Sequence, residues 1–159
     1  MRTLILPIGI PGCGKSTFME ELSETYNIPV VSSDHIRKKL YGDEAIQGDY
    51  NKVFTEVYRQ VNHWIECGVC ILDATHCTRW SRWAAVAKVC PDQVIYIVMD
   101  RDVKVAKERN AARERVCPES VIDRMAKNLR KEPPRADECR HLYIFDYDDP
   151  ALLEFLKEL

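Results

Sequence analysis

The sequence predicts a three-layer α/β fold in which helices cover both faces of a parallel sheet of roughly five strands. Short apolar segments alternate with helical segments about five times along the chain, a pattern typical of such sheets. The stretch from Gly9 to Thr17 reads GIPGCGKST and directly follows the first apolar segment. It matches the GxxxxGK[ST] pattern of a phosphate-binding loop between a strand and a helix, which narrows the prediction to a P-loop NTPase or kinase fold.

The predicted strands are short and apolar, and each is followed by polar or turn-forming residues. They span residues 3–8, 29–32, 69–72, 94–99 and 141–145. Helices are predicted over residues 15–26, 34–41, 50–66, 81–89, 102–113, 118–130 and 150–159. The helix at 50–66 has the clearest pattern, because its apolar residues recur every three to four positions: Val53, Val57, Val61, Trp64 and Ile65.

One domain covering residues 1–159 is predicted, because this length and a content of 46% hydrophobic and 30% charged residues suit a single globular domain. The net charge of −2 gives no global support for nucleic-acid binding. Residues 101–131 differ, since they contain ten basic and five acidic side chains, a local charge of +5. No apolar run approaches the roughly 20 residues of a transmembrane helix, so no membrane association is expected.

The seven cysteines are odd in number and follow no disulfide framework. We expect reduced thiols without disulfides, in a cytoplasmic protein. Cys67 and Cys70 form a CxxC pair, which has two interpretations. They are either a redox or zinc pair completed by His63, His76 or Cys77, or a helix end followed by a turn and a buried strand. The second interpretation is favoured, because no second CxxC is present to complete a zinc site.

The phosphate-binding loop predicts a nucleoside triphosphate, with ATP preferred, together with Mg²⁺. Glycines allow the backbone to curl so that N–H groups point at phosphate oxygens, and the next helix directs its positive end to the same place. Lys15 is expected to reach the β- and γ-phosphates, Ser16 to bind Mg²⁺ and Thr17 to approach the α-phosphate. Gly12, Cys13 and Gly14 complete the predicted nucleotide-binding residues. The alternative is a glycine-rich turn that binds no ligand.

Two aspartates lie at or just after predicted strand ends, at the sheet edge where open α/β sheets bind ligands. Asp34 precedes Arg37 by three residues, so one face of a helix can present a proton acceptor and a cation for phosphoryl transfer. The alternative is a helix-capping aspartate and a solvated arginine. Asp73 ends an apolar strand, where a carboxylate can hold Mg²⁺ through water or cap the following loop.

The predicted helix at 102–113 carries Arg109 and Arg113 four residues apart, with Arg115 following. Arginines on a mobile lid, here about residues 101–131, can close over a triphosphate and stabilise its charge. The alternative is an exposed charged helix.

Aromatic residues also occur in the predicted helix at 81–89 and its approach, and along the last predicted strand. Trp80 and Trp83 interleave with arginines, an arrangement that can stack a base and hold a phosphate. Trp83 is predicted to lie in the core, while the position of Trp80 stays open. Tyr143, Phe145 and Tyr147 alternate along the last strand and are predicted to pack.

Over residues 2–135 the order and spacing of these motifs resemble the kinase domain of phage-type polynucleotide 5′-kinases, a group within the small P-loop kinases. GIPGCGKST is similar to that family's GxPGSGKST, and Asp34 and Arg37 match its catalytic Asp-xx-Arg pair. The resemblance implies that Asp34 is the general base. Asp73 and Thr75 look like its strand-end pair beside the acceptor. Ser33 and His76 depart from the family pattern on the acceptor side.

Two further features belong to the resemblance. Arg109 and Arg113 match the family's lid arginines, which implies that Arg109 contacts the nucleotide and Arg113 contacts the transition state. The segment from Cys117 to Met125 resembles the region near the acceptor end, which implies a substrate-binding position for Cys117.

Three functions are therefore left open. The preferred hypothesis is an ATP-dependent kinase that phosphorylates the 5′-hydroxyl end of DNA or RNA, with Lys15, Asp34, Arg37 and Arg113 as catalytic residues. The second is a kinase for a small alcohol or a hydroxymethylated DNA base. The third is a nucleotide-binding regulatory module without transferase activity.

Overall fold

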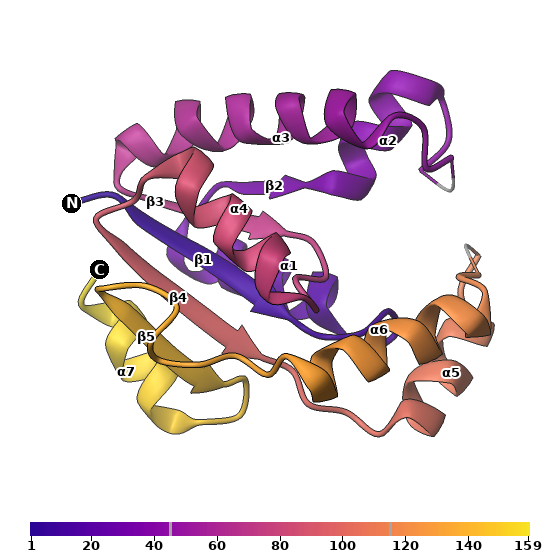
Figure 1. Ribbon diagram of the computed structural model, residues 1–159. Helices are drawn as coiled ribbons and strands as arrows, with labels where there is room; N and C mark the ends of the chain where they lie inside the picture. The colour runs from indigo at the N-terminus through magenta and orange to yellow at the C-terminus, as the bar shows by residue number, and fades with distance from the viewer. Residues whose placement is uncertain (45, 115) are drawn as a thin grey trace.

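The computed structural model describes residues 1–44, 46–114 and 116–159. Its centre is a parallel sheet of five strands in the order β2-β3-β1-β4-β5 (Figure 1). The strands are β1 (Thr3–Ile8), β2 (Val30–Ser32), β3 (Val69–Asp73), β4 (Gln93–Val98) and β5 (Leu142–Asp146). The helices are α1 (Lys15–Tyr26), α2 (Ser33–Tyr41), α3 (Tyr50–Trp64), α4 (Arg79–Val89), α5 (Val103–Ala111), α6 (Glu119–Lys131) and α7 (Pro150–Lys157), with a 3₁₀ turn at Ile65–Cys67.

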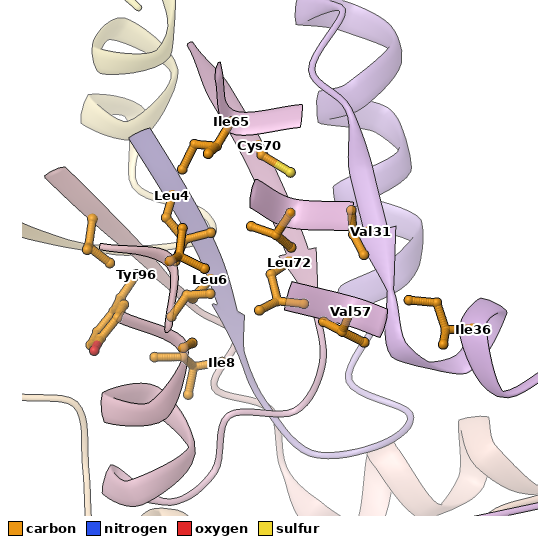
Figure 2. Close-up of a cluster of buried hydrophobic side chains, with 14 of the residues drawn as sticks. Leu4, Leu6, Ile8, Val31, Ile36, Val57, Ile65, Cys70, Leu72 and Tyr96 are labelled. Atoms are coloured by element: carbon orange, nitrogen blue, oxygen red, sulfur yellow. The ribbon is translucent and has the colours of Figure 1, made fainter. Parts of the chain in front are cut away.

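The core has one apolar layer on each face of the sheet, because successive residues of a strand point to opposite faces. Leu4, Leu6 and Ile8 of β1 pack with the apolar stripe of α3 and the small residues of α4 (Figure 2). Ile5 lies on the other face, in a cluster with Met19 of α1 and residues of α7. Full burial of the central strands explains their continuous apolar sequences.

All five strands run in the same direction, so their carboxyl ends meet at one edge of the sheet. The phosphate-binding loop, the start of α2 and the end of β3 all lie there. α5 and α6 lie beyond this edge, at the opposite end of the molecule from both chain termini (Figure 1). A third apolar cluster joins these two helices to the loop through Ile10, Cys13, Ala106 and Ile122.

The predicted fold is confirmed, and all seven helices and five strands fall within a few residues of the expected bounds. The predicted core position of Trp83 is wrong, because its side chain is 61% exposed. The buried face of α4 is formed by Ala85, Val89 and the fully buried Arg82. Because Arg82 is charged, its buried position interrupts the apolar pattern from which the buried face of a helix is predicted.

All seven cysteines are free thiols, and burial raises the pKa of Cys70 to about 12 and that of Cys77 to about 11. The described residues contain no group of three or more His, Cys, Asp or Glu side chains suited to hold a metal ion. Cys67 ends the 3₁₀ turn and Cys70 lies within the buried part of β3, which agrees with the favoured interpretation of the CxxC pair. Within the described chain, no helix combines the length and apolar character of a membrane span.

Candidate active site

The loop between β1 and α1 has the shape of a phosphate-binding loop. Gly12 and Gly14 have φ values of 82° and 94°, a conformation that side chains other than glycine rarely adopt. A Cβ atom at Gly12 would collide with the backbone carbonyl of Ala106 on α5. The loop therefore needs glycine at this position both for its own turn and for the close approach of α5.

Lys15 opens α1, and its ammonium group lies back over the loop. Nζ donates to the carbonyl oxygen of Ile10 at 3.4 Å, and the side chain is largely buried. The Cys13 backbone N–H donates to the same carbonyl at 3.2 Å, while the Cys13 thiol packs underneath Gly9. The Cys13 backbone therefore forms part of the phosphate-binding loop, while its side chain packs in the apolar core.

Ser16 and Asp73 bring two oxygen ligands together from different elements. The Ser16 hydroxyl donates to Asp73 Oδ2 at 2.8 Å, because β3 lies next to β1 and ends beside the first turn of α1. Burial raises the pKa of Asp73, while Lys15 and the Ser16 hydroxyl act in the opposite direction. Mg²⁺ prefers oxygen ligands and commonly takes one or two from the protein while water and phosphate supply the rest, so these two groups fit that ion.

Asp34 and Arg37 lie on the first turns of α2, which begins directly after β2. The Ser32 hydroxyl caps the helix by accepting from the His35 backbone N–H at 3.5 Å. Arg37 Nη1 donates to Asp34 Oδ1 at 2.9 Å and to the Ser33 hydroxyl at 3.3 Å. Asp34 and Arg37 therefore share one helix face, as their spacing predicts, and Arg37 fixes the direction of the carboxylate.

Two adjoining cavities open around these residues. The larger, of about 590 Å³, is lined by Gly12, Gly14, Lys15, Ser16, Thr17, Phe18, Glu21, Met99, Arg101, Arg109, Arg113 and Tyr147. The smaller, of about 310 Å³, is lined by Ser16, Glu20, Ser23, Glu24, Val30, Ser32, Asp34, His35, Glu44, Asp73 and Arg113. Ser16 and Arg113 line both, so the two cavities meet at these side chains. One cavity is bounded by the phosphate-binding loop, and the other contains the carboxylates of Asp34 and Asp73.

The sequence patterns did not identify Arg101 and Tyr147, which close one side of the larger cavity. The Arg101 guanidinium carbon lies 5.1 Å from the centre of the Tyr147 ring, and this ring also packs edge-on against Phe18. Tyr147 follows β5 directly and Arg101 lies three residues after the end of β4, so both lie at the sheet edge to which the rule that selected Asp73 applies. Arg101 was predicted only as a cation of the lid and Tyr147 only as a packing residue, so neither was expected to line a cavity. Three glutamates of the smaller cavity, Glu20, Glu24 and Glu44, had no motif to mark them.

Two residues that the resemblance implied for substrate binding are not among those that line the cavities. The backbone carbonyl of Thr75 accepts from the Gly9 N–H at 3.2 Å, a contact that joins the loop after β3 to the phosphate-binding loop. Cys117 exchanges two hydrogen bonds through its backbone with the side chain of Asn110, at 2.7 and 2.9 Å. Within the described chain both residues therefore make structural contacts around the site.

The arginines of the predicted lid also differ from expectation in one respect. α5 ends at Ala111 rather than at Arg113, so Arg109 and Arg113 do not share a helical face. A tighter turn follows, in which the Arg113 N–H donates to the Asn110 carbonyl at 3.2 Å. Both arginines nevertheless reach the larger cavity. Arg115 lies outside the described residues.

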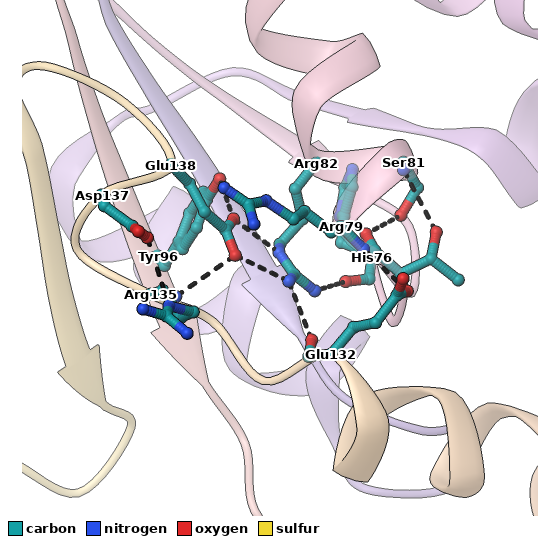
Figure 3. A network of polar contacts seen from close by, with 10 residues as sticks. His76, Arg79, Ser81, Arg82, Tyr96, Glu132, Arg135, Asp137 and Glu138 are labelled. Carbon is teal, nitrogen blue, oxygen red and sulfur yellow. Dashed lines mark hydrogen bonds and ion pairs between the residues drawn. The ribbon is translucent and has the colours of Figure 1, made fainter.

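A buried polar network holds the loop that follows Asp73 (Figure 3). Arg82 forms an ion pair with Glu138 at 2.8 Å, and its other donors reach the carbonyls of His76 and Glu132 at 3.0 and 2.8 Å. His76 has a φ of 50° and lies within hydrogen-bond distance of two backbone carbonyls through Nδ1. Burial lowers its pKa to about 4, so the ring is neutral near pH 7 and its protonated Nδ1 donates to these carbonyls.

The strand order, the loop and the edge position of the site define the class of this protein as an α/β fold of the P-loop kinase type. The chain belongs to the family AAA_33, described as an AAA domain, whose model it matches over residues 4–133. No curated protein sequence matches it.

Solved structures share the fold at low sequence identity. A gluconokinase from Sinorhizobium meliloti 1021 is 20% identical, with 99% of this chain and 89% of that chain covered and a TM-score of 0.64. A chain of the Pnkp1/Rnl/Hen1 RNA repair complex is 22% identical with a TM-score of 0.72, and the match covers 81% of this chain and 44% of that one. Chaetomium thermophilum Kti12, solved with ADP-AlF3, is 16% identical over 98% of this chain and 95% of that chain, with a TM-score of 0.67.

Proposed function

We propose that the chain is an ATP-dependent kinase that transfers a γ-phosphoryl group to a hydroxyl. The observation that carries this proposal is the meeting of two cavities at Ser16 and Arg113, with the Ser16–Asp73 contact at 2.8 Å on the boundary. A nucleotide in the larger cavity would direct its terminal phosphate at this boundary, and an acceptor in the smaller cavity would meet it there.

The residues divide the reaction between them. Asp34 accepts the proton of the acceptor hydroxyl as that oxygen attacks the γ-phosphorus and the bond to the β-phosphate oxygen breaks. Arg37 keeps the carboxylate in one orientation through its bond of 2.9 Å. Lys15 and Arg113 stabilise the charge on the transferring group. Ser16 and Asp73 would hold Mg²⁺, which when bound neutralises phosphate charge.

α5 and α6, within residues 101–131, act as a lid over the nucleotide in this proposal, and the whole chain works as one kinase domain. Support comes from the contact between Gly12 and the Ala106 carbonyl and from the apolar cluster that joins both helices to the loop. Arg109 then contacts the nucleotide, while Arg113 reaches across to the acceptor side. Closing a site in this way excludes water from the transferring phosphoryl group.

The preferred acceptor is the 5′-hydroxyl end of DNA or RNA. Support comes from the order of motifs across residues 2–135, including the Asp34–Arg37 pair, and from the RNA repair complex among the structures that share the fold. A terminal sugar and its hydroxyl are uncharged, so they can enter a cavity lined by carboxylates while the phosphates of the strand stay outside.

A small alcohol is the second candidate, and a specific observation favours it. The smaller cavity measures about 310 Å³ and is lined by five carboxylates against the single arginine Arg113. Such a lining favours neutral or cationic acceptors, because like charges repel phosphate groups. A regulatory module that only binds or hydrolyses ATP is the third candidate, and it gives Asp34 no role in transfer.

One assay separates these candidates. The protein is incubated with γ-labelled ATP, Mg²⁺ and either a 5′-hydroxyl oligonucleotide or a panel of sugars and amino alcohols, and the labelled product is identified. Asp34→Asn should lower the rate of transfer roughly a hundredfold or more while ATP binding stays unchanged. Glu154→Gln, a change of the same kind at an exposed carboxylate on α7, serves as the matched control. Normal transfer by Asp34→Asn would refute the mechanism, and label on a small alcohol alone would replace the preferred acceptor.

A further inference from the structure

A cluster of aromatic side chains lies beside the acceptor side of the site and belongs to neither cavity. Tyr50, the first residue of α3, is 46% exposed, and Trp80, the second residue of α4, is 58% exposed. Their ring centres are 6.1 Å apart at an interplanar angle of 43°. Phe54 stacks on Tyr50 at 4.4 Å and 24°, and it packs in turn against the core. We call Tyr50, Phe54 and Trp80 the aromatic platform.

The platform lies close to the catalytic pair. α3 and α4 both begin at the carboxyl edge of the sheet, where Asp34 and Asp73 are found. Burial raises the pKa of the Tyr50 hydroxyl and the positive charge of Arg37 lowers it, so Arg37 is within electrostatic reach of Tyr50. The same guanidinium bonds Asp34 at 2.9 Å, and its Nε has no hydrogen-bond partner among the described residues. Ile36, the neighbour of Arg37 on α2, lies in the same apolar cluster as Phe54, so the helix that carries the proposed general base packs beside the platform.

The rim of the platform carries positive charge. Arg79, next to Trp80, has an exposed side chain, and its backbone N–H donates to Glu132 at 3.2 Å, which brings the last turn of α6 alongside. Arg130 and Lys131, the last two residues of α6, are exposed cations next to Glu132, and Arg124 and Lys127 lie farther back along the same helix. Two carboxylates also lie near this rim: Glu132 accepts from the Arg79 N–H, and Asp49 caps α3, while Glu56 is paired with Arg59.

Exposed aromatic faces beside a row of cations are the features that bind single-stranded nucleic acid without base-specific contacts. Each base has a planar face that stacks on Trp or Tyr, and the backbone phosphates pair with Lys and Arg. A single strand is favoured over a duplex, because the bases of a duplex are already stacked on one another. This charge complementarity selects a nucleic acid over an uncharged sugar as the occupant.

We propose that the aromatic platform stacks a base at the 5′ end of a single-stranded acceptor and so presents its terminal hydroxyl to Asp34. The inference rests on the proposed kinase function and names the acceptor class of that same site. It adds a binding determinant in Tyr50 and Trp80 that lies outside both cavities. It also resolves the conflict of charge at the smaller cavity, because only the uncharged terminal sugar has to enter between the carboxylates.

The chain provides a matched control for the test. Trp83 is on the same helix and is 61% exposed, yet it forms no ring contact with the platform among the described residues. Trp80→Ala and Tyr50→Ala should each raise the KM for a 5′-hydroxyl dT hexamer about 5- to 150-fold, the range expected for loss of one stacked base. Trp83→Ala should leave the KM for the hexamer and for ATP unchanged.

A second comparison isolates stacking from any general damage to the fold. The hexamer is prepared with abasic residues at its first two positions, and its KM is measured with the natural protein and with Trp80→Ala. The abasic change should weaken the natural protein and have little further effect on Trp80→Ala, because the two changes remove the same contact. Equal effects of the abasic change on both proteins would overturn the proposal.

Binding without catalysis separates this inference from the kinase proposal. With Trp64→Phe and Trp83→Phe in place, Trp80 is the one remaining tryptophan, and its fluorescence should be quenched by the hexamer in the absence of ATP. Quenching without phosphoryl transfer would refute the kinase and keep the platform. Transfer that depends on Asp34 but is indifferent to Trp80 would refute the platform and keep the kinase. A halved molecular mass in Trp80→Ala would assign the platform to a subunit interface and overturn the proposal.

Discussion

Removing the charge of Glu138 should destabilise the protein far more than any surface substitution. The Arg82 and Glu138 side chains are 0% and 4% exposed, and their ion pair is 2.8 Å long. Loss of one partner from a buried pair leaves the other charge without compensation, which costs about 3–5 kcal/mol. The Tyr96 hydroxyl also donates to Glu138 at 3.0 Å and would lose a charged acceptor. Glu138→Gln should therefore lower the free energy of unfolding by several kcal/mol.

The size of the expected change makes the test decisive. For a chain of this length, each kcal/mol shifts the Tm by roughly 2–4 °C, so Glu138→Gln should unfold about 6–20 °C lower. Urea unfolding followed by circular dichroism gives the free energy itself. Glu154→Gln removes the same charge from an exposed pair with Lys157 and should leave the curve unchanged.

A small change in stability would show that the Arg82–Glu138 pair is not needed. The free energy of unfolding of Glu138→Gln could lie within about 1 kcal/mol of that of the natural protein. Arg82 would then have another partner or contact with water, and the buried pair would not stabilise this region. The double change Arg82→Met with Glu138→Leu gives an independent check. It should recover part of the loss, since apolar residues of similar volume tolerate burial without a partner.

Three further predictions concern the site and its surroundings. Burial lowers the pKa of His76 from 6.5 to about 4, so the unfolded chain binds the extra proton between these values, and stability should fall by up to about 3 kcal/mol as the pH drops through this range. His76→Asn suits the positive φ and keeps a donor, so urea unfolding at several pH values should show a flatter dependence. Gly12→Ala should abolish ATP binding measured by calorimetry, because its Cβ would collide with the Ala106 carbonyl; unchanged binding would contradict the tight loop. Arg109→Ala should mainly raise the KM for ATP, whereas Arg113→Ala, which loses a group lining both cavities, should mainly lower kcat. Equal effects of the two changes on both constants would contradict that division.

Much of the fold could be predicted from the sequence, because local patterns and the global arrangement agree. A phosphate-binding loop follows a buried strand, so the apolar segment before Gly9 was predicted to be one. The structure has this strand, β1, at the centre of the sheet. Asp34 and Asp73 were selected by one rule, the position of strand ends, and the structure has both in the smaller cavity. Periodicity and the geometry of parallel sheets carry this information without any knowledge of side-chain contacts.

The missed features depend on contacts between distant parts of the chain. Arg82 is buried because Glu138 lies 56 residues away in sequence and reaches it from a loop, which no helical pattern on α4 reveals. Glu44 joins the smaller cavity from the loop after α2, while Glu20 and Glu24 reach it from α1. Tyr147 continues the alternation of Tyr143 and Phe145 in β5, yet it lies one residue past the strand and lines the larger cavity.

The position of Arg113 depends on Asn110, which lies between Arg109 and Arg113 in the sequence. α5 ends two residues before Arg113, so helical geometry does not set its direction. Asn110 is 1% exposed, and its amide both donates to the Cys117 carbonyl and accepts from the Cys117 N–H, which closes the turn that carries Arg113. An aspartate in its place could not donate to that carbonyl, and an alanine would lose both of these hydrogen bonds. The two cavities thus share a cation whose position depends on one buried amide, while Ser16, the other shared residue, is held by the first turn of α1.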